Sequence, residues 1–205
     1  MWCTLHLQDG NEKKTEEFVT SLLPEDICTR CFHITRRRLR KREGQWMEES
    51  EELLPGYVFI ETSQPETVYR ELKKASKYLL FSDERFVSVL TEDDRKFLEQ
   101  ITDKTGRIGL SVVRVKKAGD RKKIEYLSGP LAKISDQISW VDLHRRFAKV
   151  DTVFLKDKKG FSLSFYFEGE SIVPENGQQK VPHFARGCVS GSGEKTKGND
   201  ALCGM

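Results

Sequence analysis

The segment from Leu53 to Ile60, which reads L-L-P-G-Y-V-F-I, constrains the fold more than any other part of the chain. Pro55 and Gly56 open a strand, and the residues after them are apolar without alternation. A strand that is covered on both faces reads as a continuous apolar run, whereas a half-exposed strand alternates polar and apolar residues. The segment therefore predicts a central strand with other layers packed on both sides.

The elements around this strand predict an α/β sandwich over residues 1–102. Thr91, followed by Asp94 three residues later, is typical of a helix start. The expected strands are residues 2–7, 27–35, 57–60 and 86–90, and the expected helices are 11–23, 65–77 and 91–101. This order is the one expected when helices pack on one face of an antiparallel sheet.

The second half of the chain has a different pattern. Residues 103–110 contain two glycines and no periodicity, which predicts a linker. Short strand-like runs follow without a helix between them, and they predict a small β-barrel over residues 111–170. These runs are residues 112–115, 124–127, 138–141, 148–154 and 161–167. Residues 171–205 are rich in small polar residues, and we expect them to be disordered. The predicted fold class is therefore α+β.

The net charge of the 205-residue chain is +3, but its two halves differ in sign. Residues 1–102 contain 16 basic and 20 acidic side chains, whereas residues 106–170 contain 14 basic and 8 acidic ones. The acidic half also carries the sharpest basic feature, residues 36–42, which read R-R-R-L-R-K-R. This run is either a solvated hairpin arm paired with the acidic residues 48–52, or a contact for nucleic-acid phosphates.

The sequence offers little sign of catalysis. It lacks an H-E-x-x-H or G-x-S-x-G motif, and G-S-G-E-K-T at residues 191–196 lacks the spacing of a phosphate loop. A zinc-dependent enzyme using Cys28, Cys31 and His33 is a weaker hypothesis, because residues i and i+3 of a strand point to opposite faces. We therefore expect no metal, no cofactor and no enzymatic activity.

The composition favours a cytoplasmic protein without a membrane partner. Five cysteines, an odd number, fit free thiols in a reducing cytosol better than a disulfide framework. The longest apolar runs are only a few residues, and the N-terminus lacks the pattern of a secretory signal.

Several segments resemble the NusG-type transcription elongation factors. W-C-T-L-H-L-Q-D-G at residues 2–10 and P-G-Y-V in the central strand resemble that family's N-terminal domain. S-G-P-L-A-K-I-S-D-Q-I-S-W-V-D at residues 128–142 resembles the KOW motif, in which Gly129 and Pro130 open a turn. The segments L-R-K-R-E-G-Q-W and D-L-H-R-R-F-A are most similar to the LoaP-type antiterminators. The resemblance implies a NusG-like N-terminal sandwich, a linker and a KOW-type β-barrel.

The chain departs from the family pattern at four positions. Cys3 and Leu54 stand where the family usually has Tyr and Phe, and Lys133 and Asp136 stand where glycines are usual.

The resemblance also implies a function. Family members dock on the clamp helices of RNA polymerase, bridge the DNA channel and suppress pausing; Trp2, Leu54 and Tyr57 match positions near that docking surface. LoaP-type members recognise an RNA hairpin, which implies processive antitermination. The alternative is a general NusG-like factor that modulates pausing, termination and transcription–translation coupling. Candidate nucleic-acid contacts are Lys13, Lys14, Arg36, Arg37, Arg38, Arg40, Lys41, Arg42, His144, Arg145 and Arg146.

The family resemblance further implies partners for the second domain. These are a termination helicase or a ribosomal protein, and non-template DNA is a further partner of the whole factor. We expect the chain itself to be a monomer.

Overall fold

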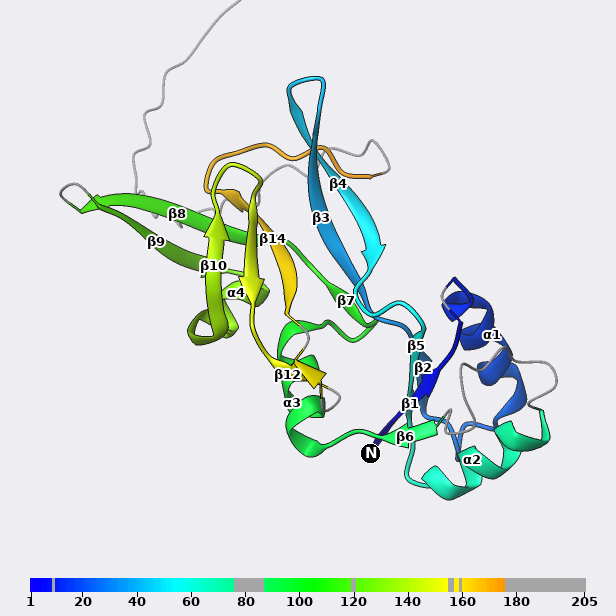
Figure 1. The fold of residues 1–205 in the computed structure, drawn as a ribbon. Helices are drawn as coiled ribbons and strands as arrows, with labels where there is room; N and C mark the ends of the chain where they lie inside the picture. Colours follow the sequence, from blue (N-terminus) through cyan, green and yellow to red (C-terminus); the bar gives the residue numbers. More distant parts are fainter. Residues whose placement is uncertain (9, 76–86, 119–120, 155–156, 159, 176–205) are drawn as a thin grey trace, which may run out of the picture.

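The N-terminal half of the chain is built around strand β5 (Tyr57–Glu61), which lies inside a four-stranded sheet. The computed structural model describes residues 1–8, 10–75, 87–118, 121–154, 157–158 and 160–175 (Figure 1). The sheet has the order β2 (Arg30–Phe32), β5, β1 (Trp2–His6) and β6 (Val87–Val89), and all its neighbours are antiparallel. Val58, Phe59 and Ile60 are all fully buried. The central position predicted from the apolar run is confirmed.

Layers cover both faces of this sheet. Helices α1 (Glu12–Leu22) and α2 (Pro65–Lys74) contribute Val19 and Leu72 to a core with Val58 and Ile60. Helix α3 (Glu92–Ile101) contributes Leu98 to a second core that contains Phe59. Figure 1 shows α1 and α2 together on one side of the sheet. Because side chains alternate along a strand, β5 supplies residues to both cores.

Two of the predicted local signals form as expected. The Thr91 hydroxyl accepts a hydrogen bond from the backbone N–H of Asp94 at 3.2 Å, and α3 begins at Glu92, directly after Thr91. The Pro55–Gly56 turn is held by the buried carboxylate of Glu12, which accepts the Gly56 N–H at 2.7 Å. Burial would raise the pKa of Glu12, but hydrogen bonds from backbone N–H groups lower it overall.

A long hairpin extends from the N-terminal half. It consists of β3 (Thr35–Arg42) and β4 (Gln45–Glu52), which pair antiparallel along their whole length. Glu43 and Gly44 form the turn with φ values of 50° and 82°. Two consecutive residues with positive φ are typical of the tight hairpin turn whose twist matches that of the strands.

The expected linker at residues 103–110 is not free of secondary structure. Strand β7 (Arg107–Ile108) pairs parallel with β3 and completes a three-stranded sheet, β4-β3-β7. Gly106 has a φ of +77°, and a Cβ there would lie 2.8 Å from the His33 carbonyl oxygen. Backbone pairing, which has no side-chain periodicity, thus orders part of the expected linker.

The C-terminal half is mostly strands, as predicted. Strands β8 (Ser111–Ala118), β9 (Arg121–Ser128), β10 (Ile138–Asp142), β11 (Phe147–Val150) and β14 (Phe161–Phe167) form one sheet. Its order is β10-β11-β14-β8-β9, with β14 parallel to β8. Strands β12 (Val153–Phe154) and β13 (Asp157–Lys158) form a separate pair. The molecule as a whole is a mixed α+β fold with several sheets.

The expectation that no helix interrupts these strands was wrong. Gly129 and Pro130 open the short helix α4 (Pro130–Lys133), and the 3-10 helix η2 (Ser135–Gln137) follows it. Gly129 has a φ of +84°, and a Cβ would lie 2.7 Å from the Leu110 carbonyl oxygen. Glycine is therefore required here by both conformation and space.

The first residues of the predicted disordered tail are ordered. Val173 pairs with β4, since its carbonyl accepts from Glu48 N–H at 2.8 Å and its N–H donates to the Trp46 carbonyl at 3.0 Å. Glu175 forms an ion pair with Arg37 at 2.6 Å. We call residues 171–175 the strap; the rest of the predicted tail, residues 176–205, lies outside the described residues.

The two halves, here called the N-terminal lobe (residues 1–102) and the C-terminal lobe (residues 111–167), share one core. Phe59 and Leu98 belong to the same buried cluster as Leu163 and Phe165. At the junction, Phe97 lies 6.0 Å from Phe161 between ring centroids. The lobes are thus packed against each other by apolar contact. Among the described residues, no helix has both the length and the apolarity that a membrane span requires.

Candidate nucleic-acid interface

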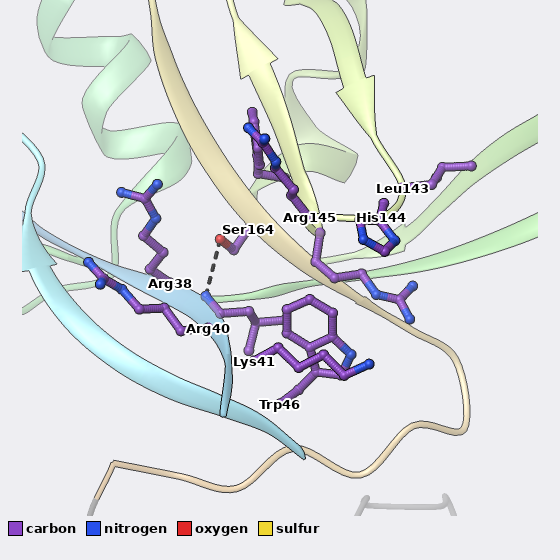
Figure 2. Close-up of a pocket in the computed structure, with 11 residues that line it drawn as sticks. Arg38, Arg40, Lys41, Trp46, Leu143, His144, Arg145 and Ser164 are labelled. Atoms are coloured by element: carbon purple, nitrogen blue, oxygen red, sulfur yellow. Dashed lines mark hydrogen bonds between the residues drawn. The ribbon is translucent and has the colours of Figure 1, made fainter. Parts of the chain in front are cut away.

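A cleft of about 750 Å³ lies between the β3–β4 hairpin and the C-terminal lobe (Figure 2). The hairpin and the β10–β11 turn supply most of its wall, and β14 supplies Ser164. Among the residues that the structure describes, its lining includes five permanent cations and no acidic side chain. The lining residues are Arg38, Leu39, Arg40, Lys41, Trp46, Leu143, His144, Arg145, Arg146, Phe147 and Ser164. The structure therefore brings together the two basic segments that the sequence presents about 100 residues apart.

The hairpin is fixed against the C-terminal lobe by polar contacts. The Arg36 guanidinium donates to the Ser162 carbonyl at 2.6 Å, and the Leu39 N–H donates to the Ser164 hydroxyl at 3.3 Å. The Leu39 side chain is buried at this contact. These contacts give the hairpin wall of the cleft a defined position.

The basic run is paired with acidic residues across the hairpin, as the first of its two interpretations predicts. Arg36 and Arg38 share Glu51, with Arg38 Nη1 3.0 Å from the carboxylate. Glu51 is partly buried, which would raise its pKa, but the two guanidinium groups lower it overall. Arg37 pairs with Glu48 at 3.4 Å on the other face of the hairpin, where Glu175 also contacts it.

Pairing does not give every cation of the hairpin a carboxylate of its own, because one carboxylate can serve two arginines. Glu49 is shared by Arg40, at 2.8 Å, and Arg42, and the side chains of these arginines are 55% and 61% exposed. Lys41 is exposed, and within the described part of the chain no carboxylate lies within 4.0 Å of it. The exposed cations at the hairpin tip are therefore available to a second anion.

The β10–β11 turn forms the opposite wall. The Asp142 carboxylate accepts from the backbone N–H groups of His144 and Arg145 at 2.9 and 2.8 Å. Asp favours such turns, because its side chain hydrogen-bonds the backbone two or three residues on. The side chain of Arg145 is 75% exposed, and the Asp142 carboxylate lies 3.9 Å from its Nε.

Arg146 points inward and has an unusual environment. Its φ is 62°, a conformation that non-glycine residues rarely adopt. Its guanidinium lies 3.5 Å from the Phe167 ring centroid and 5.5 Å from that of Trp46, and it pairs with Glu170 at 2.5 Å. Burial lowers the pKa of Arg146, although Glu170 opposes the change. Arg146 therefore joins the strand β14 aromatic ring to the hairpin by cation–π contacts.

The three residues implied in polymerase docking are not equally accessible. Trp2 is 3% exposed and Leu54 8% exposed, so both are part of the core. The Trp2 ring lies 5.1 Å from Phe32 between centroids. Tyr57 is half-buried and stacks on His6 at 4.7 Å. In this structure, Tyr57 alone of the three has substantial exposed area.

Other predicted contacts lie away from the cleft. Lys13 and Lys14 are exposed on α1, which contributes no lining residue. Gly129 and Pro130 open α4 rather than a plain turn, and Pro130 is buried.

The cysteine cluster forms part of the N-terminal core. Cys3, Cys28 and Cys31 are buried free thiols, and burial raises the pKa of each of them. Among the described residues, no group of three or more His, Cys, Asp and Glu side chains has an arrangement suited to a metal ion.

Sequence reasoning missed Trp46, which lies in the cleft wall next to Lys41. The Lys41 ammonium is 5.9 Å from its ring centroid. The sequence does contain a signal for Trp46. It lies directly opposite Lys41 across the tight turn of the hairpin, and residues that face each other in this way lie on the same face of the two strands.

Comparison with protein-family models and with curated proteins finds no match to this chain.

Proposed function

We propose that this chain is a non-enzymatic regulator of transcription elongation, which binds RNA polymerase through its N-terminal lobe and nucleic acid through the cleft. The observation that carries the nucleic-acid part is the meeting of residues 38–41 and 144–146 in one cleft lined by cations. Cations in a groove bind nucleic acid by releasing the counterions of its phosphates. The family resemblance supplies the rest of the proposal: a NusG-like N-terminal domain, a KOW-type second domain and RNA-hairpin recognition that promotes antitermination.

The polymerase part rests on the resemblance at W-C-T-L-H-L and P-G-Y-V. In this proposal Tyr57 contacts the clamp helices, and the buried Trp2 and Leu54 belong to the core cluster against which Tyr57 packs. Docking would hold the clamp closed by binding that state more tightly than the open one.

A gel-shift series at physiological salt tests the nucleic-acid part. We expect an RNA hairpin to bind more tightly than a scrambled RNA, and Arg40→Ala with Arg145→Ala to weaken binding and reduce the salt slope by about two. The variant with Lys74→Ala and Lys96→Ala is the matched control, because both lysines are 66% exposed and neither lines the cleft. If this control weakens binding as much as the cleft variant does, the cleft is not the site. Equal affinity for both RNAs would instead favour the general elongation factor.

Co-purification with RNA polymerase tests the docking part. We expect Tyr57→Ala to abolish binding without lowering the melting temperature much, because Tyr57 is only half-buried. Retained binding with an unchanged melting curve would show that the docking surface lies elsewhere.

A further inference from the structure

We propose that the cleft binds an unpaired nucleotide, whose base stacks on Trp46 while Lys41 and Arg145 hold the phosphates on either side. This inference rests on the proposed function and deepens it, since it assigns the cleft to an unpaired nucleotide of the RNA, such as one in the loop of a hairpin. The inference does not rest on charge alone, because cations suffice to bind phosphates and do not account for an aromatic ring in the cleft wall.

Trp46 is held as a platform inside the cleft. Arg146, which is only 9% exposed, lies against its ring and is itself fixed by Phe167 and Glu170. Among the described residues, two nitrogens of Arg146, Nε and Nη1, are buried without a hydrogen-bond partner. Arg146 thus has both an unfavourable backbone conformation and incomplete hydrogen bonding. In this position its guanidinium contacts the Trp46 indole and holds that ring in place.

The other group at the Trp46 ring can move. Lys41 is exposed and its ammonium is 5.9 Å from the ring centroid, so a flat ligand can displace it at small cost. The displaced ammonium stays beside the ligand, where it can pair with a phosphate. Arg145 reaches the cleft from the opposite wall with three quarters of its side chain exposed. Figure 2 shows Lys41 and Trp46 on the hairpin side, with Arg145 and His144 on the turn side.

This set of groups suits an unpaired base rather than a duplex. A base within a helix has its faces covered by its neighbours, whereas an unpaired base can stack on an aromatic side chain. A positive groove with an aromatic platform is the usual construction of sites for single strands. The volume of about 750 Å³ lies within the range of sites that enclose small ligands.

Fluorescence anisotropy with the full chain tests the inference. The probes are labelled single strands of twelve uridines or twelve thymidines, a twelve-residue abasic strand and a matched duplex. We expect the single strands to bind at least about tenfold more tightly than the abasic strand, because removing the bases removes stacking but keeps the phosphates. Comparison of the two base-containing strands shows whether RNA or DNA is preferred. Equal affinity for the abasic strand would overturn the inference.

Substitution gives an independent arm. Trp46→Leu should weaken single-strand binding about tenfold or more while leaving the salt slope and duplex binding unchanged. Trp140→Leu is the matched control, because Trp140 is 53% exposed and does not line the cleft. If Trp46→Leu has no effect, or affects both forms equally, stacking is excluded, yet sensitivity to Arg40 and Arg145 would still support the proposed function. If the unmodified chain binds none of these nucleic acids, both this inference and the proposed function are overturned.

Discussion

At the scale of single residues, His33 gives the N-terminal lobe a pH-dependent stability. Its Nδ1 lies 2.5 Å from the Glu16 carboxylate and its Nε2 lies 3.5 Å from Glu52. The hydrogen bond with Glu16 and the charges of Glu52 and Glu12 raise the pKa of His33, although burial opposes them. The protonated form is therefore favoured by folding. The resulting stabilisation is complete below about pH 6.5, the pKa of an unfolded histidine, and is lost as the pH rises through the higher folded pKa.

We expect the free energy of unfolding of the unmodified protein to fall as the pH is raised through this window, as measured by urea unfolding. His33→Gln should flatten that dependence, because glutamine cannot be protonated. His144→Gln, at an exposed histidine outside this cluster, is the control and should keep it. A slope that persists in His33→Gln would assign the titration to another group.

At the scale of elements, the strap protects the outer edge of the hairpin. Strand β4 is an edge of its three-stranded sheet, and the strap satisfies backbone groups of Trp46 and Glu48 along that edge. An uncovered edge strand exchanges its amide hydrogens readily, and it can pair with a strand of another molecule. Truncation after residue 170 should therefore speed amide hydrogen exchange at Glu48 and promote self-association. Truncation after residue 175 keeps every one of these contacts, so it should change neither the amide exchange at Glu48 nor the degree of self-association. Equal exchange at Glu48 in the two truncations would mean that the strap does not protect the edge.

The elements that sequence patterns predicted well are those with a local cause. The apolar run gave the central position of β5, and the Thr91–Asp94 pair gave the start of α3. Strands β3 and β4 carry almost no apolar alternation, and opposite charges on facing and diagonal residues of the two strands stabilise them instead. Strand β7 and the strap are ordered by backbone bonds to a distant hairpin. No local pattern reveals such bonds.

At the scale of the whole molecule, the candidate site exists because the lobes are docked. The sequence predicts the cationic residues of the cleft as two separate basic groups, and their meeting depends on Leu39, Ser164 and the packing of Phe97 on Phe161. These contacts join residues more than 60 positions apart. Periodicity and composition predict the structure within each lobe, but they carry no information about how the two lobes pack against each other.

The shared core has a consequence for unfolding. Leu163 is 1% exposed in the C-terminal lobe, yet it belongs to the same buried cluster as Phe59 of the N-terminal lobe. Leu163→Ala should cost about 2–5 kcal/mol of unfolding free energy, through lost burial and the cavity left behind. If the lobes unfold as one unit, native-state hydrogen exchange should accelerate to the same extent in β11 and in the distant strand β5. Acceleration confined to β11 would show that the lobes open separately, and the cleft between them would then form and disappear with docking rather than persist as a fixed site.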